Sequence, residues 1–166
     1  MYAWIGSNYT KVERTATWDY LQAFVDEARK QGLRIHAAIN TFVGGNQIDG
    51  GTGLLYRDQS KAEWATQMNM QVGITSVMNT SESTKFFNPA HPEVQTFLCD
   101  LLKDLAGYDL DGIFLDRGRF LNLQADFSEE SRKQFEEYMG GIRIQNYPND
   151  ILAPGASSLP ATYPKY

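Results

Sequence analysis

The sequence predicts an α/β fold with a parallel sheet, because an amphipathic helix twice leads straight into a short apolar strand. Apolar side chains recur at helical spacing in residues 17–32 and again in residues 92–107. Residues 33–42 and the apolar run that ends at Asp116 follow these helices directly. Helices that alternate with buried strands are typical of parallel sheets, whose strands read as nearly unbroken apolar runs.

Charge and backbone signals mark the ends of the predicted helices. The first helix has Asp19 in its first turn and stops at Gly32. The second begins at Pro92, since proline suits the first helical position. A third helix is predicted between Ser128, a good N-cap, and Gly140.

Alternation along each strand separates an aliphatic face from a more polar one. On the first strand His36 and Asn40 share a face, and on the second Asp116 points away from the aliphatic side. The aliphatic face, which we expect to meet the helices, carries Ile35, Ala37, Ile39, Ile113 and Leu115.

Two regions do not fit a minimal helix and strand pattern. Residues 43–87 are glycine-rich and polar, and a connection of this length predicts a functional loop or an insertion with its own short strands, one of them around residues 63–68. Residues 151–166 contain three prolines without periodicity and resemble a linker. We therefore expect residues 1–166 to be a single fragment of one domain with a linker-like tail.

Composition excludes several functions. A hydrophobic fraction of 42% in 166 residues is typical of a globular unit, and a net charge of −5 offers no basic surface for nucleic acid. No apolar run is long enough to span a bilayer. Two histidines and one cysteine, far apart, make no standard zinc site, and the glycines match no nucleotide-binding motif, so no metal or other cofactor is expected. Cys99 falls on the apolar side of its helix, where small buried thiols are common.

The leading functional residue is Asp116, because an acid that closes a buried strand lies where the strand gives way to an active-site loop. Asn40 ends the other strand. If the two strands are neighbours in register, Asn40 can donate a hydrogen bond to Asp116 or to a substrate hydroxyl. The alternatives are a loop-capping carboxylate for Asp116 and loop-fixing hydrogen bonds for Asn40.

Three ordered blocks carry a resemblance to a known family. They are GLRIHAAIN at residues 32–40, FNPAHPEV at 87–94 and YDLDGIFLDR at 108–117. Together they resemble the bacterial glycosyl hydrolase-like 10 family, whose members are (β/α)8 barrels distantly related to the α-amylase superfamily. The resemblance covers roughly residues 17–140.

The resemblance implies that Asp116 is the nucleophile or a stabilising carboxylate, that Asn40 lines the same pocket, and that the partner is an oligo- or polysaccharide. A whole barrel takes about 250 residues, so the chain is expected to be a partial (β/α)8 barrel whose remaining strands supply the general acid. The isolated chain is then predicted to be inactive; turnover would point to an internal acid such as Asp126, Glu82 or Asp58. The resemblance also implies an extracellular, periplasmic or surface-attached bacterial protein.

Four further side chains are candidate substrate contacts, each with a structural alternative. His36 lies mid-strand, where a hydrogen-bonded core histidine is the more common role. Arg117 and Arg119 could bind an anionic sugar, or pair with nearby acids such as Asp126 and Glu129. Trp64, with Tyr56 and Phe42, could stack on a sugar, but loop aromatics more often anchor their loop.

Two other functions stay open at this point. One is a glycan-binding module or degenerate barrel that holds sugar without cleaving it. The other is a small doubly wound α/β binding domain, which strand order would separate from a barrel segment.

Overall fold

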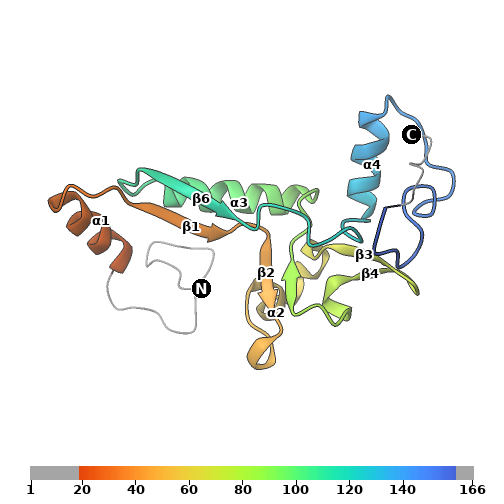
Figure 1. The fold of residues 1–166 in the computed structure, drawn as a ribbon, viewed down its shortest axis with the longest axis horizontal. Coiled ribbons are helices and arrows are strands. Elements are labelled where there is room, and N and C mark those ends of the chain that lie inside the picture. Colours follow the sequence, from red (N-terminus) through yellow and green to blue (C-terminus); the bar gives the residue numbers. More distant parts are fainter. Residues whose placement is uncertain (1–18, 160–166) are drawn as a thin grey trace. The chain divides into compact units, whose positions relative to one another are not determined.

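The computed structural model describes residues 19–159 and divides the chain into two compact units (Figure 1). Unit 1 comprises Met1–Thr41 and Gln95–Asp116, and unit 2 comprises Phe42–Val94 and Arg117–Tyr166. Both contain helices and strands, and a parallel strand pair forms the sheet of unit 1. The α/β class predicted from the sequence is confirmed.

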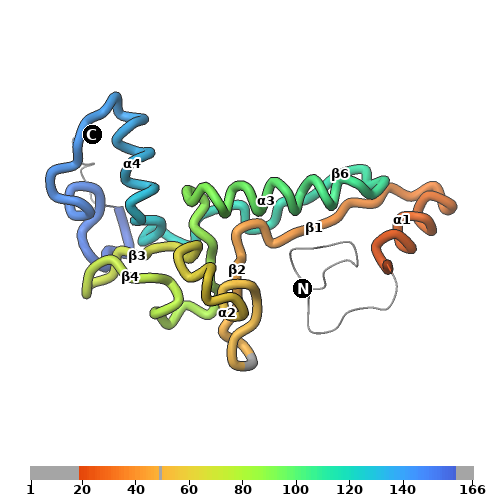
Figure 2. The backbone as a smooth tube through the Cα atoms, turned by 180° about the vertical axis from the view of Figure 1, so that it is seen from behind, coloured from red at the N-terminus to blue at the C-terminus, as the bar shows by residue number. Residues whose placement is uncertain are grey.

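The part of unit 1 that the structure describes contains two helices and two strands. Its elements are α1 (Tyr20–Lys30), β1 (His36–Asn40), most of α3 (Pro92–Leu105), and β6 (Gly112–Asp116). The two strands pair in parallel over five residues, from His36 opposite Gly112 to Asn40 opposite Asp116. α3 runs alongside the pair in both views (Figures 1 and 2).

The helices of unit 1 form where capping and apolar periodicity predict them. Asp19 is the N-cap of α1, and its side chain accepts a hydrogen bond from the backbone of Gln22 at 3.0 Å. Gly32 adopts φ 66° after the helix, a conformation that glycine reaches without strain. The apolar stripe of α3 buries Val94, Leu98, Leu101 and Leu105.

Unit 2 is built from short elements. Apart from α4, none exceeds six residues, which agrees with the expected insertion that has structure of its own. They are β2 (Val43–Asn46), η1 (Ile48–Gly50), α2 (Leu54–Arg57), η2 (Gln59–Trp64), β3 (Gln67–Met70), β4 (Gly73–Ser76), η3 (Val77–Asn79), β5 (Thr84–Phe86) and α4 (Glu129–Tyr138). β2 pairs with β5 and β3 pairs with β4, both antiparallel.

Close packing explains the glycine-rich run that begins unit 2. A Cβ atom at Gly51 would lie 2.4 Å from the Tyr56 ring, and one at Gly45 would lie 2.9 Å from the same ring. A Cβ atom at Gly53 would lie 2.6 Å from the carbonyl oxygen of Gly44. These glycines let β2 and α2 approach closely, so the run has a packing role.

A buried lysine holds the turn between β4 and β5. Lys85 is only 1% exposed, and its Nζ donates to the carbonyls of Val77 and Thr80 at 3.0 Å each. Burial lowers the pKa of this ammonium group, while the charge of Glu82 acts in the opposite direction.

Three expectations about the fold need correction. Residues 63 and 64 end the 3₁₀ helix η2, and strand β3 begins only at Gln67. Cys99 is exposed, because the buried stripe of α3 runs along Leu98 and Leu101 and leaves the intervening position outside it. The start of the linker-like tail is packed: Leu152 is 3% exposed, and its carbonyl accepts a hydrogen bond from the side chain of Asn69. Residues 160–166 of that tail lie outside the described part.

Candidate functional site

One face of the β1–β6 pair is open and carries the predicted strand-end residues. Because partners in a parallel pair point to the same side, His36 and Asn40 share this face with Phe114 and Asp116. All four are exposed, Phe114 to 63%. On the opposite face, Ala37, Ile39 and Ile113 are half-buried, as expected of the aliphatic side.

The carboxyl end of the pair brings Asn40 and Asp116 together. They are direct partners in the strand register, which is the neighbour relation that the sequence argument required. The backbone N–H of Thr41 donates to the carbonyl of Asp116 at 2.7 Å and closes this end of the ladder. An exposed carboxylate beside an exposed amide can accept hydrogen bonds from a bound hydroxyl or attack an electrophilic carbon.

The residue after Asp116 has an unusual backbone. Arg117 adopts φ 51°, the left-handed conformation, which costs free energy for a residue with a side chain. Such conformations gather at functional sites and tight turns. The chain therefore turns sharply where the strand ends, and the turn leaves Asp116 at the rim of the sheet.

The amino end of the pair also carries carboxylates, and Arg29 and a backbone N–H hold them. Arg29 donates through Nε to Asp109 and through Nη1 to Asp111, both at 2.9 Å. Asp111 also accepts from the backbone of Ile35 at 2.8 Å. The bond from Ile35, followed by the one from Arg29, lowers the pKa of Asp111.

Two further contacts complete the amino end. The hydroxyl of Tyr108 donates to Asp19, the cap of α1, at 2.6 Å. Burial, and then this bond, raise the pKa of Tyr108. His36, expected in the core, is exposed and lies over Gly112, where a Cβ atom would be 2.8 Å from the imidazole Cδ2.

The two arginines after β6 belong to unit 2 and donate hydrogen bonds within that unit. Arg117 donates to the hydroxyl of Thr84 at 3.4 Å. Arg119 does not form the ion pairs suggested by the sequence; it donates to the carbonyls of Phe120 and Leu121 at 3.1 and 3.0 Å. Both acceptors belong to the loop that carries Arg119. The backbone of that loop therefore determines where the Arg119 side chain lies.

Trp64 is buried in unit 2, which argues against a role in sugar stacking. It is 4% exposed, its Nε1 donates to Glu93 at 3.0 Å, and Lys61 lies 4.2 Å from its ring centroid. Its ring also meets Phe87 edge-on at 6.1 Å. These contacts fit the alternative role, in which Trp64 anchors its loop. Trp64 is therefore not part of the proposed site.

The internal acids suggested by the sequence have structural partners. Asp126 accepts from the backbone of Gln67 at 2.6 Å and from the hydroxyls of Ser128 and Ser131. Asp58 caps η2. Glu82 accepts from the side chain of Asn122 at 3.3 Å.

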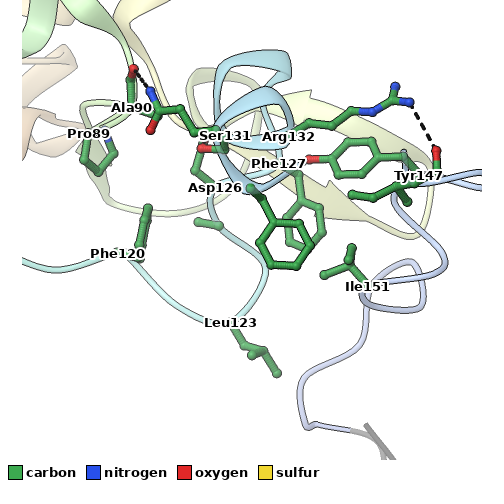
Figure 3. A pocket seen from close by; sticks show the side chains of 14 residues that line it. Pro89, Ala90, Phe120, Leu123, Asp126, Phe127, Ser131, Arg132, Tyr147 and Ile151 are labelled. Atoms are coloured by element: carbon green, nitrogen blue, oxygen red, sulfur yellow. Dashed lines mark hydrogen bonds between the residues drawn. The ribbon is translucent and has the colours of Figure 1, made fainter. Parts of the chain in front are cut away.

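Unit 2 also contains a pocket that the sequence did not reveal (Figure 3). It encloses about 430 Å³ and is lined by the aromatic residues Phe120, Phe127, Phe135 and Tyr147. Its polar wall groups are engaged: Gln134 donates to the carbonyl of Ala90 at 3.0 Å, and Arg132 to that of Ile144 at 3.3 Å. The lining comes from residues 89–151, so no local sequence signal marks it.

Metal centres and membrane spans require arrangements that residues 19–159 do not show. Within residues 19–159, no group of three or more His, Cys, Asp or Glu side chains is arranged to hold a metal ion. None of the helices in that range is long and apolar enough to cross a bilayer.

Comparisons with known proteins identify a family and one relative. Residues 1–150 match the family described as Glycosyl hydrolase-like 10. An S-layer-related protein of Niallia circulans is 33% identical over 142 residues, which cover 81% of this chain and 9% of that protein. The chain thus spans less than a tenth of the length of this relative.

Proposed function

Because the chain belongs to the glycosyl hydrolase-like 10 family, we propose that Asp116 acts as the nucleophile or stabilising carboxylate in the cleavage of O-glycosidic bonds. The register that pairs Asn40 with Asp116 on the open face is the observation that carries the proposal. In this proposal the side-chain amide of Asn40 donates a hydrogen bond to Asp116 or to a sugar hydroxyl.

A second carboxyl group is needed to protonate the leaving oxygen. Asp126, Asp58 and Glu82 all accept hydrogen bonds that hold local structure, and we assign the general acid to sequence outside residues 1–166. The isolated chain is then inactive.

The exposure of β6 and the length of the relative support a partial (β/α)8 barrel. Strands of parallel sheets are normally covered on both faces, whereas Leu115, on the aliphatic face of β6, is 49% exposed. Further helices of the protein would cover it. The relative extends far beyond the matched region, which is consistent with a longer protein that supplies the rest of the barrel.

Carbohydrate is the substrate class that the open face fits. Sugars combine hydroxyls with an apolar ring face. The open side of the β1–β6 pair offers an amide, a carboxylate and, two residues before Asp116, the exposed ring of Phe114. His36 and Arg117 remain proposed contacts. Phe114 could have been found from the sequence, since it shares a strand face with Asp116.

A second candidate function is glycan binding without cleavage by a degenerate barrel. The relative's name, S-layer-related protein, states no hydrolytic activity, which leaves this function open, and it supports a surface location. Retained binding of polysaccharide, with turnover absent from the natural protein, would distinguish this function from hydrolysis.

The test uses the natural protein that contains residues 1–166 and measures release of reducing sugar from a panel of bacterial and dietary polysaccharides. Asp116→Asn should lower kcat at least about 10³-fold, because a neutral amide neither attacks nor stabilises a cation. Asp100→Asn, on α3, removes a carboxylate that pairs with Lys103 and should leave kcat unchanged. Unaltered turnover in Asp116→Asn contradicts the proposed role, whereas binding without turnover in the parent protein supports the second function.

A further inference from the structure

The amino end of the β1–β6 pair holds a charged network that spans both strands. Arg29 makes contacts with Asp109 and Asp111, the two residues of the Asp-x-Asp sequence that precedes β6. Its Nη2 also donates to the carbonyl of Asp109 at 2.8 Å. The planar guanidinium therefore fixes the direction in which the chain enters β6.

Asp111 connects this network to β1. Its backbone N–H donates to the carbonyl of Ile35 at 2.9 Å, while its carboxylate accepts from the N–H of Ile35 at 2.8 Å. The side chain thus takes the place of a ladder carbonyl one residue before the first strand pair, His36 with Gly112. A carboxylate held in this way specifies which residue of β1 faces which residue of β6.

From these contacts we infer that Arg29, Asp109 and Asp111 act as a register clamp that places Asn40 beside Asp116. The inference rests on the proposed function for its consequence, since the clamp positions the proposed catalytic carboxylate without touching substrate. Its geometry stands independently, because every contact lies within unit 1.

In this two-stranded sheet, burial of side chains specifies the strand register only weakly. Burial of one face normally specifies register, because a slip of one residue turns every side chain to the other side. Here the pair has only five residue pairs, and both faces are partly exposed at Phe114 and Leu115. Within the described residues burial therefore discriminates weakly between registers, and the clamp and the close approach of His36 to Gly112 add to that discrimination.

A register shift would separate the proposed site residues. A slip of one residue would move Asp116 to the face opposite Asn40, and a slip of two would place Asn40 beside Phe114. Neither register brings the amide to the carboxylate.

Disulfide cross-linking reads the register directly. In a Cys99→Ser background, which removes the exposed native thiol, the double variant Ala38→Cys with Phe114→Cys joins residues that are partners in the observed register. The matched control, Asn40→Cys with Phe114→Cys, joins residues two positions out of register, about 8 Å apart at Cα from the strand spacing and rise. That separation exceeds the roughly 7 Å that a disulfide bridges without backbone movement.

With the clamp intact, the in-register pair should oxidise at least about tenfold faster than the control pair. Arg29→Ala should reduce that ratio severalfold, and Arg29→Lys should restore it only in part, because lysine keeps the charge but loses the two-pronged geometry. Melting temperature is measured on the same variants. A lower melting temperature with an unchanged cross-linking ratio would overturn the inference, since it would show a merely stabilising network.

If Arg29→Ala does not fold, Asp109→Asn tests whether the contacts of Arg29 specify the strand register. It weakens one carboxylate contact of Arg29 and leaves the bonds between Asp111 and Ile35 in place, so a smaller loss of register fidelity is expected. An unchanged ratio in this variant also counts against the clamp. Cross-linking involves no turnover, so the clamp can hold even if Asp116→Asn leaves hydrolysis intact, and the two proposals fail separately.

Discussion

The two ends of the β1–β6 pair use the same residue type in opposite ways. At the amino end, Asp109 and Asp111 are engaged by Arg29 and by a backbone N–H. At the carboxyl end, Asp116 is exposed beside an exposed Asn40. One short motif therefore combines two carboxylates that hold the strand entry with a third, exposed carboxylate at the carboxyl end of the same strand.

The largest effect on stability is expected from a buried leucine in the core of unit 1. Leu105, on α3, is 1% exposed, and Leu105→Ala should lower the free energy of unfolding by about 2–5 kcal/mol through lost contacts and a residual cavity. Hydrogen exchange should then accelerate by similar factors at the backbone N–H groups of Asp111 and Thr41, one at each end. Acceleration at only one of them would show that the two ends open independently.

A pair of matched substitutions tests the difference between the two ends. Asp111→Asn should lower the melting temperature at pH 7 by roughly 5 °C, whereas Asp116→Asn should change the free energy of unfolding by less than about 1 kcal/mol. Asp111 has a folded pKa below its usual value, so its stabilisation is present above about pH 4 and is lost as pH falls through the lowered pKa. Thermal melts of the parent protein and Asp111→Asn should therefore converge towards pH 2. A constant difference down to that pH would contradict the assignment.

The sequence predicted the parts of the fold that depend on local periodicity and capping. Helices α1, α3 and α4, the strand that ends at Asp116 and the parallel pairing were all expected, because apolar spacing and residues such as Ser128 act locally. The sequence did not predict that Asn40 pairs with Asp116; it predicted their contact only if the two strands were neighbours in register. It depends on contacts such as that between Asp111 and Ile35, which lie 76 residues apart.

The contacts that the sequence did not specify depend on long-range packing in unit 2. Burial of Trp64 requires Glu93 and Phe87, which follow it by more than 20 residues. Arg119 has carboxylates nearby in sequence, yet Asp126 is already engaged by serines and a backbone N–H. Periodicity contains no information about such competition for partners, so loop residues were the least predictable part of the candidate site.

The smallest effect is expected at the outer edge of the amino end. Tyr108→Phe removes the hydroxyl that donates to Asp19 at 2.6 Å but keeps the ring, so the free energy of unfolding should fall by about 1 kcal/mol. The loss should appear mainly as faster hydrogen exchange in the first turn of α1, because Asp19 caps that helix through Gln22. Exchange at Thr41, at the carboxyl end, should stay at the parent rate. Equal acceleration at Thr41 would mean that the helix cap and the Asn40–Asp116 pair belong to one cooperative unit, and the contrast between the two ends would then be one of chemistry and not of stability.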